Sequence, residues 1–553
     1  KPPCILYTGV RYTPTAHPSK PVLASRPRPL YYERLDTTNI RTRKAFMASD
    51  RAPYISKSKY LAGLQCPKLL WTHFNDRDLI PEPDEAQQHI FDTGHMVGDL
   101  AKRLYPGGKE VPMIYQADDA LELTVTATQD LMKRRIPIFE ASFLVDDRYC
   151  RVDVLVPVPG PDGDRASGDA WDLVEVKSST RVKDVNINDV AFQYDTLTRA
   201  GVDLNRLYLM HVDTSYLRGE HFEVGRFFAL DDVTDRAMRL INYVPTAMNR
   251  MLETVGGPDP DTPIGPRCTS PYTCPLKESC WSVLPDNPVT DLYRSGARAF
   301  GLLDEGIFTI ESTPDSRLTP RQIIQKKAVA TGEVQVDKEA LGKWMRGLKY
   351  PLYHLDFETM NPAIPPLAGT RPYQRIPFQF SLHVQDEPGE RPRHVEYLAT
   401  WNDVPLPGDP RPGLVEALKA IGPDGTVLCW NMGFEKGVLE DLAEMFPAEA
   451  EFLAGLVERM DDLIIPFRSF WVYHPAQRGN CSLKAVLPAL TDFDYDELAI
   501  ADGNHAARQY QQALYGNVTV KERVTIFQNL SEYCKLDTMA MVAILHRLEK
   551  LVE

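Results

Sequence analysis

The chain has 553 residues, of which 43% are hydrophobic and 25% charged, and its formal net charge is −14. This length is too great for one ordinary hydrophobic core and predicts two or three domains, and the lack of an apolar run of about 18 residues excludes a membrane-spanning helix. The negative charge does not exclude a nucleic-acid partner, because sites that bind metal ions concentrate carboxylates and a local basic surface can still bind phosphates. We therefore expect a cytoplasmic globular protein with no membrane partner.

The beginning of the sequence differs from the rest. Residues 1–46 are rich in Pro and Arg and show no apolar periodicity, whereas Met47 opens a more regular pattern. We interpret residues 1–50 as a disordered extension, or as one that does not belong to the native protein, with Met47 as the true initiator. An Arg-rich transit peptide is the alternative interpretation.

Residues 51–290 have the pattern of a mixed α/β domain. Apolar residues are spaced for helix from about residue 56 to residue 105. Three strand-like runs then precede a helix that carries Val190 and Leu197, and a fourth strand follows that helix. The predicted strands are Ile138–Val145, Tyr149–Val156, Trp171–Val176 and Leu207–Val212. Strands followed by a helix and another strand indicate a mixed α/β core.

Residues 291–348 predict a helical connector, in which Thr319 caps a helix and Pro320 occupies its first position. A second α/β domain is predicted over residues 349–553, in the order strand, strand, strand, helix, strand, helix. The chain then ends in a long helix from about Lys521 to Leu551. The expected elements are the strands Tyr353–Phe357, Phe378–Val384, His394–Leu398 and Thr426–Trp430 and the helices Gly413–Ile421 and Phe434–Met445.

A first candidate site lies on two predicted strands of the first domain. Glu175 and Lys177 are two residues apart on one strand, so both side chains leave the same face, and Asp153 on the preceding strand can point to the same place. Converging carboxylates suit Mg²⁺ or Mn²⁺, which lowers the pKa of its bound water, and Lys177 would orient that water or stabilise charge on a phosphate. An exposed strand face is the alternative, because Glu-x-Lys tripeptides are common.

This arrangement, followed by a helix that carries Gln193, resembles the PD-(D/E)xK nucleases and in particular their RecB-like branch. The resemblance implies that Gln193 belongs to the catalytic site. It also implies a site acid at Glu140, for which a plain charge at a strand start is an equal alternative. His95 departs from the family pattern, because it lies one turn before the usual position of a metal-binding His. The residues that the resemblance assigns to catalysis beside Gln193 are Asp153, Glu175 and Lys177.

Four cysteines form a possible cofactor site. Cys268, Cys274 and Cys280 lie at regular intervals in a Pro-rich segment, and Cys66 lies far upstream. Thiolates select iron–sulfur clusters or zinc. One Cys before the core and three after it resembles the iron–sulfur RecB-like nucleases, in which a [4Fe–4S] cluster joins the two ends of the domain. The Cys-x₅-Cys-x₅-Cys spacing departs from the commoner Cys-x₂-Cys-x₅-Cys, so that zinc, or four unligated buried cysteines, are the alternatives.

A second candidate site combines acids from three distant segments. Asp356 and Glu358 share one face of a strand, and Glu435 opens a helix that follows a buried strand. Tyr533 and Asp537 lie one turn apart on the last helix. Four carboxylates can hold two cations about 4 Å apart, which is the two-metal arrangement for phosphodiester hydrolysis, and Tyr533 would position the attacking water.

The three motifs, in this order, resemble the DEDD exonucleases of the ribonuclease H-like fold, in the variant that has Tyr in the last motif. The resemblance implies removal of nucleotides from 3′ ends. Glu435 departs from the usual Asp, and Asp461 and Asp462 are the fallback acids. Further segments, such as Ser482-Leu-Lys484, resemble an uncharacterised bacterial family, the domain of unknown function 2779, over residues 300–553.

The sequence thus predicts a metal-dependent nuclease that acts on single-stranded or 3′ ends of DNA or RNA. A RecB-like core is expected over residues 51–290 and an exonuclease domain over residues 349–553. Residues 371–375 would hold a strand end, with Tyr373 stacked on a base, or form a plain surface loop. Two alternative functions are a scaffold that binds nucleic-acid ends with one or both sites inactive, and an exonuclease whose first domain is an iron–sulfur clamp.

Overall fold

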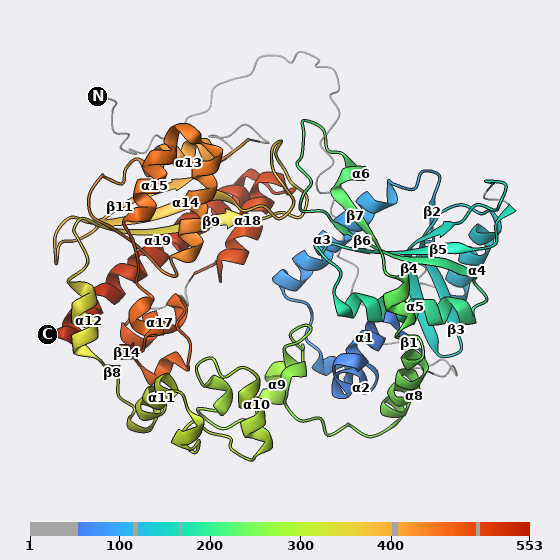
Figure 1. Ribbon diagram of the computed structural model, residues 1–553, viewed down its shortest axis with the longest axis horizontal. Helices are drawn as coiled ribbons and strands as arrows, with labels where there is room; N and C mark the ends of the chain where they lie inside the picture. The colour runs from blue at the N-terminus through green and yellow to red at the C-terminus, as the bar shows by residue number, and fades with distance from the viewer. Residues whose placement is uncertain (1–52, 114–119, 165–166, 401–407, 494–497) are drawn as a thin grey trace, which may run out of the picture.

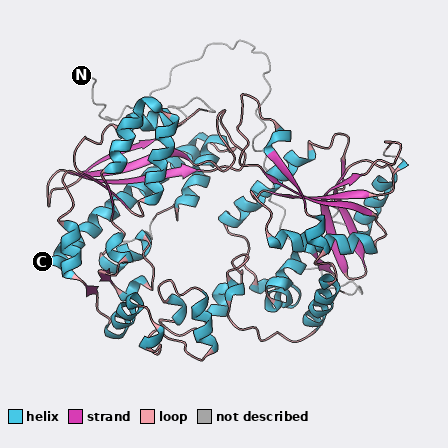
Figure 2. Cartoon of the chain, viewed as in Figure 1, coloured by secondary structure: helices cyan, strands magenta, loops and turns pink. Residues whose placement is uncertain are grey.

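The structure is a computed structural model that describes residues 53–113, 120–164, 167–400, 408–493 and 498–553. The predicted N-terminal extension, residues 1–50, lies outside these ranges. The fold is mixed α/β, as predicted, and its two main sheets lie on opposite sides of the molecule (Figures 1 and 2). Short helices connect the two sheets along the lower edge of Figure 1.

The first sheet has seven strands in the order β2-β3-β4-β5-β6-β7, with β1 paired to β4. β3, β4 and β5 are antiparallel neighbours, whereas β5 and β6 run parallel because a helix, α5, connects them. All four strands predicted for this part of the chain are present. The strands are β1 (Ile55–Ser56), β2 (Lys109–Glu110), β3 (Ile138–Val145), β4 (Arg148–Pro157), β5 (Trp171–Lys177), β6 (Leu204–Val212) and β7 (Phe228–Asp232).

Helices α1, α5 and α8 pack together with the first sheet around a buried apolar core. The helical region predicted over residues 56–105 is divided, because Cys66 has an extended backbone and Pro67 starts a new helix. The helices are α1 (Lys57–Gln65), α2 (Pro67–Asn75), α3 (Glu85–Lys102), α4 (Ala120–Lys133), α5 (Asp184–Arg199), α6 (Val224–Phe227), α7 (Thr234–Met238) and α8 (Tyr243–Gly256).

The connector is an ordered set of short helices. Thr319 caps α11 by accepting a hydrogen bond from the backbone N–H of Gln322, as predicted. The buried side chains of Gln322 and Gln325 hydrogen-bond to the backbone of residues 291–293 and so hold this segment against α11. The elements here are α9 (Lys277–Trp281), α10 (Ala297–Asp304), α11 (Pro320–Thr331), α12 (Lys338–Met345) and a two-stranded sheet of β8 (Gln335–Val336) with β14 (Val472–Tyr473).

The second sheet has five strands in the order β11-β10-β9-β12-β13. Its central strand, β9, is antiparallel to β10 and parallel to β12. β13, which also runs parallel to β12, was not predicted from the sequence. The strands are β9 (Leu352–Met360), β10 (Ile376–Gln385), β11 (Arg393–Leu398), β12 (Thr426–Cys429) and β13 (Met460–Asp462).

Helices cover both faces of the second sheet. Leu355 and Phe357 of β9 pack with α13, α14 and α15, whereas the side chains that alternate with them face α18 and α19. None of the helices in the described ranges has the length and apolar character needed to cross a bilayer. The helices are α13 (Arg411–Leu418), α14 (Gly433–Met445), α15 (Ala450–Glu458), α16 (Ile465–Arg468), α17 (Leu483–Leu490), α18 (Gly503–Tyr515) and α19 (Val520–Val552).

The loop that follows β9 docks on the half of the molecule that contains the first sheet. The Arg371 guanidinium donates to the carbonyl of Ser215 at 2.7 Å, and the Tyr373 hydroxyl donates to the carbonyl of Ser178. The Arg375 guanidinium contacts α14, where it pairs with Asp441 at 2.7 Å. The arginines and the tyrosine of residues 371–375 are therefore engaged in contacts within the chain.

Candidate active sites and a cysteine pocket

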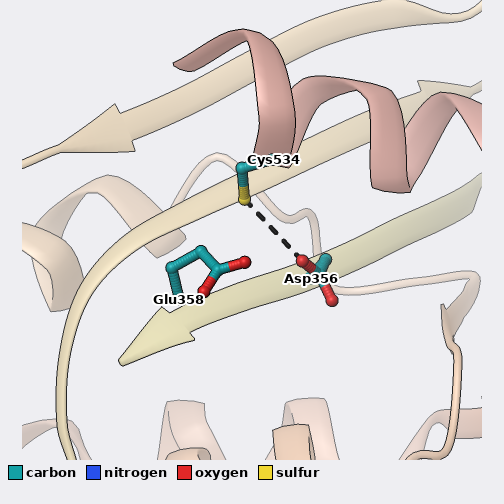
Figure 3. A group of neighbouring side chains, drawn as sticks. All are labelled: Asp356, Glu358 and Cys534. Carbon is teal, nitrogen blue, oxygen red and sulfur yellow. Dashed lines mark hydrogen bonds between the residues drawn. The ribbon is translucent and has the colours of Figure 1, made fainter. Parts of the chain in front are cut away.

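The second candidate site is centred on β9 and α19. Oxygen atoms of Asp356 and Glu358 and the sulfur of Cys534 lie within 4.8 Å of one another (Figure 3). The Cys534 thiol donates a hydrogen bond to Asp356 Oδ2 at 3.7 Å. Asp356 and Glu358 leave the same face of β9, as predicted, and that face lies beneath α19. Cys534 was not predicted as a site residue, although it precedes Asp537 by three residues and thus shares its helix face.

The carboxylates of this site act strongly on one another. Burial raises the pKa of Asp356 well above its usual value, and Asp537, Glu358 and Glu435 raise it further. Burial and Asp537 likewise raise the pKa of Glu358. Like charges in a buried site repel one another, so the group favours either bound protons or bound cations. The structure thus brings together all four acids that the sequence assigned to this site.

Glu435 occupies the first turn of α14 and is only 3% exposed. Its Oε2 atom has no hydrogen-bond partner among the described residues. Burial, together with the neighbouring Asp462, raises the pKa of Glu435 to about 8. Asp462 itself accepts hydrogen bonds from the backbone N–H groups of Asn431, at 2.9 Å, and Ile464, at 3.2 Å. The fallback acid Asp462 therefore holds the turn that leads into α14.

Tyr533 and Asp537 are both buried on α19, as their one-turn spacing predicts. The Lys484 ammonium lies 5.0 Å from the centre of the Tyr533 ring and acts to lower the pKa of Glu358. Gly503 approaches from the start of α18, where an added Cβ would lie 3.4 Å from Glu358 Oε2. A cation and a helix N-terminus thus adjoin the acids, and neither was assigned to the site from the sequence.

The first candidate site is a buried network around Glu175. The Lys177 ammonium donates to Glu175 Oε1 at 2.5 Å, and the Gln193 amide donates to Glu175 Oε2 at 2.7 Å. Lys57 donates to the same carboxylate at 2.8 and 3.1 Å. Although burial opposes ionisation, Lys177 and Lys57 hold the pKa of Glu175 well below its usual range. The structure therefore brings Glu175, Lys177 and Gln193 together.

Asp189 completes this network and was missed in the sequence. It accepts hydrogen bonds from Lys177 at 2.9 Å and from Gln193 at 2.9 Å, and Lys57 lies 3.7 Å away. A signal existed, because Asp189 lies four residues before Gln193 on the same predicted helix and so shares its face. Lys57, which sequence analysis did not assign to the site, lies on α1 and reaches across to both acids.

Asp153 lies one position beyond the Val154–Val174 pair of the β4–β5 ladder, and the continued register sets it opposite Glu175. Its Oδ2 accepts a hydrogen bond from the backbone N–H of Val176 at 2.7 Å. Burial and the charge of Glu175 raise the pKa of Asp153 to about 7. Asp153 is thus close enough to Glu175 for each carboxylate to influence the other.

Two other candidates have different surroundings. Glu140 pairs with the Arg151 guanidinium at 3.1 Å, and its backbone φ of 56° is unusual for a residue other than glycine. His95 is exposed on α3. We do not include either residue in the network around Glu175.

The four candidate cysteines line one small pocket, although Cys66 is distant from the other three in the sequence. Cys66, Cys268 and Cys274 are buried. Burial raises the pKa of Cys274 to about 11, and the other three thiols act in the same direction. Lys68 and Lys277 lie at the pocket; burial raises the pKa of Cys280, and the charge of Lys68 opposes this shift. The residue set fits a group that binds several thiolates.

Residues 353–482, which include β9 and α14, match a family described as a domain of unknown function (DUF2779). A stretch of 229 residues is 23% identical to an uncharacterized protein (UU173) of Ureaplasma parvum serovar 3. That stretch is 37% of this chain and spans about a third, 32%, of the relative's length. No solved structure matches the chain. The matched family segment thus contains Asp356, Glu358 and Glu435 of the second site.

Proposed function

We propose that this protein is a metal-dependent nuclease that hydrolyses phosphodiester bonds at the ends of DNA or RNA. The observation that carries the proposal is the meeting of four carboxylates from β9, α14 and α19: the buried Glu358, Glu435 and Asp537 and the half-buried Asp356. Burying several negative charges together is costly unless cations neutralise them. Two divalent ions would do so, in the arrangement used for in-line phosphodiester hydrolysis.

In this proposal the four carboxylates hold Mg²⁺ or Mn²⁺, which supplies water activation and charge neutralisation when bound. Tyr533 orients the attacking water, because it lies one turn from Asp537 on the same helix face. Lys484 offers a cation beside Glu358. The order of strands and helices from β9 to α14 is the order expected of a ribonuclease H-like core, which supports a DEDD-type, 3′-directed exonuclease.

The first site is proposed as a second, PD-(D/E)xK-type centre. Asp153 and Glu175 would hold a divalent ion, with Gln193 and the newly found Asp189 beside them, and Lys177 would stabilise charge on the phosphate. The parallel pair β5–β6 is joined by α5, and Asp189 and Gln193 of this helix contact Glu175 and Lys177 near the C-terminal end of β5. This arrangement supports a RecB-like core.

One observation favours a different role for the first domain. Both Lys57 and Lys177 already neutralise Glu175 and Asp189, so that a cation must compete with two ammonium groups. A first domain that binds a strand without cutting it, beside an active exonuclease domain, is the second candidate function. A scaffold with both sites inactive is the third alternative, and the four-carboxylate cluster argues against it.

The cysteine pocket is proposed to hold a [4Fe–4S] cluster, with zinc as the alternative. The pocket joins Cys66, just before α2, to the segment after α8, and so would fasten the two ends of the first domain. Its role would be structural, because none of the candidate catalytic side chains lines this pocket.

Single-site variants test the nuclease proposal. Asp356→Asn and Glu175→Gln are compared with the natural chain on 5′-labelled and 3′-labelled single strands with Mn²⁺. We expect Asp356→Asn to abolish the ladder of products shortened from the 3′ end, and Glu175→Gln to spare that ladder. If only Asp356→Asn changes any product, the first domain acts as a clamp. Cleavage that survives both substitutions, or no cleavage by the natural chain, contradicts the proposal.

A further inference from the structure

A basic pocket lies beside the four-carboxylate site. Its volume is about 500 Å³, within the range of roughly 300–1,000 Å³ that small-molecule sites have. The segment before α10, the turn after β12, the helix α16 and the loop before α17 each contribute to its wall. The lining residues that the argument uses are Arg294, Trp430, Asn431, Arg468, Asn480 and Ser482.

The charge of this pocket is opposite to that of the chain as a whole. Arg294 and Arg468 line the pocket. Arg321 lies close enough that all three arginines oppose the rise in pKa that burial causes in the Cys481 thiol. In the part of the chain that the structure describes, these three guanidinium groups have no hydrogen bond or ion pair through their side chains; Arg294 only lies over the ring of Tyr293, at 5.3 Å. Arg468 lies near enough to Asp462 to oppose the rise in pKa that burial causes in that carboxyl. In a protein of net charge −14, a gathering of arginines that form no ion pair in the described ranges indicates a site for an anion.

The pocket is held in shape by contacts that do not involve Arg294, Arg321 or Arg468. Arg478 pairs with Asp291 at 2.8 Å, and Gly479, with a φ of 73°, approaches so closely that an added Cβ would lie 2.0 Å from the Asp291 carbonyl. The buried Gln325 also binds this carbonyl and the backbone N–H of Tyr293. The connector therefore fixes the backbone next to Arg294, so that a ligand meets a preformed site.

Two segments of the chain line the pocket and continue directly into the site of the four acids. Asn431, with a φ of 68°, lines the pocket four residues before Glu435, and its backbone N–H donates to Asp462. Leu483 lines the pocket immediately before Lys484, whose ammonium acts on Glu358. The pocket and the carboxylates therefore share the turn before α14 and the start of α17.

We infer that this pocket binds a nucleotide of the strand whose 3′ end lies among Asp356, Glu358, Glu435 and Asp537, with the phosphate on Arg294 and Arg468. The inference rests on the proposed function and names a substrate subsite for it. Guanidinium groups match phosphate geometry with paired hydrogen bonds, and the Trp430 ring and the polar groups of Asn431, Asn480 and Ser482 suit a base and a sugar.

Equilibrium binding tests this subsite without cleavage. A fluorescent oligothymidylate is titrated with the full chain in EDTA at several salt concentrations. We expect Arg468→Gln and Arg294→Gln each to weaken binding by about tenfold, and each to reduce the slope of log K against log salt by about 0.7. Arg468→Lys, which keeps the charge, should bind the oligonucleotide with an affinity between those of the natural chain and Arg468→Gln. Arg547→Gln, an exposed arginine of α19, is the matched control and should not change either quantity.

Unchanged binding in Arg468→Gln and Arg294→Gln would overturn the inference, and so would equal losses in these variants and in Arg547→Gln. Competition with thymidine monophosphate shows whether the pocket binds the terminal nucleotide of the strand or an internal one. If it displaces the oligonucleotide from the natural chain, the pocket takes a terminal nucleotide; if it does not, while the arginine variants remain weak, the pocket takes an internal one. Arginine-dependent binding without any cleavage would refute the nuclease proposal alone, and cleavage with arginine-independent binding would refute the subsite alone.

Discussion

The Tyr373 hydroxyl donates a hydrogen bond to the backbone carbonyl of Ser178, the residue that follows Lys177 of the first candidate site. Tyr373 also packs against the same apolar cluster as Val176 of β5, although it belongs to the loop after β9. Its φ of 57° is strained for a tyrosine, and such strain persists only where the surrounding structure enforces it. The two candidate sites are therefore joined through one loop.

We expect Tyr373→Phe to destabilise this junction. The substitution keeps the ring and removes the hydroxyl, so the free energy of unfolding should fall by about 1 kcal/mol. Urea unfolding measures this loss, with Tyr272→Phe, an exposed tyrosine, as the control. A variant as stable as the natural chain would show that the hydrogen bond contributes nothing.

Removing one acid of the second site should stabilise the metal-free protein. Burial and neighbouring carboxylates raise the pKa of Asp356, so that the ionised group is unfavourable at neutral pH. Asp356→Asn removes that repulsion and should raise the melting temperature in EDTA by a few degrees. Mn²⁺ should then stabilise the natural chain and the exposed control Asp304→Asn more than it stabilises Asp356→Asn. A lower melting temperature in EDTA would mean that Asp356 has a purely structural role.

Lys57→Met should make the first site a better cation site. The substitution removes one of two ammonium groups from Glu175 and Asp189, at a cost to the metal-free protein on the order of 2 kcal/mol. The unneutralised carboxylates should then bind Mn²⁺ more tightly, which calorimetric titration in an Asp356→Asn background measures. Lys133→Met, at an exposed lysine, is the control. Unchanged Mn²⁺ affinity would show that Lys57 does not compete with a cation.

His354 should make the protein sensitive to acid. It is fully buried, neither ring nitrogen has a partner among the described residues, and burial lowers its pKa to about 3. Because the folded pKa is below the unfolded value of about 6.5, only the unfolded chain gains a proton as the pH falls from about 6.5 to 3, and stability is lost across that window. His354→Leu should remove about 3 kcal/mol of this loss by pH 4. Denaturant unfolding at pH 7 and pH 4 measures the loss of unfolding free energy in each protein. An equal loss in the natural chain and in His354→Leu would contradict the prediction.

Cys274→Ser should reduce bound iron, or zinc, in anaerobically purified protein. The four thiols line one pocket, so that loss of one ligand weakens the whole site. Elemental analysis and visible absorbance identify the metal, and Cys150→Ser, a buried cysteine elsewhere in the first domain, is the control. A natural chain that folds without bound iron or zinc would favour four unligated cysteines.

Local patterns predicted the elements well where they were strong. The strand Ile138–Val145 and the cap at Thr319 are present as predicted, because apolar alternation and capping chemistry act over a few residues. β13 was missed because its sequence, Met460–Asp462, is short and acidic, and only pairing with β12 makes it a strand.

In the candidate sites, too, contacts set by local spacing could be predicted, whereas contacts between distant segments could not. Acids two apart on one strand, such as Asp356 and Glu358, could be paired from their spacing alone. Lys57 could not be assigned to Glu175, because 118 residues separate them and their contact depends on how α1 packs against the sheet. Arg371 and Tyr373 could not be recognised as parts of a junction, because their partners, Ser215 and Ser178, lie in the other half of the chain.

Calorimetric titration of the natural chain with Mn²⁺ tests the central claim most directly, because it asks whether the four clustered carboxylates hold cations without reference to any substrate. We predict saturable binding at neutral pH that releases protons and is lost in Asp356→Asn and Asp537→Asn but kept in Asp304→Asn. Binding that is absent from the natural chain, or that survives the loss of Asp356 and Asp537, would contradict the account.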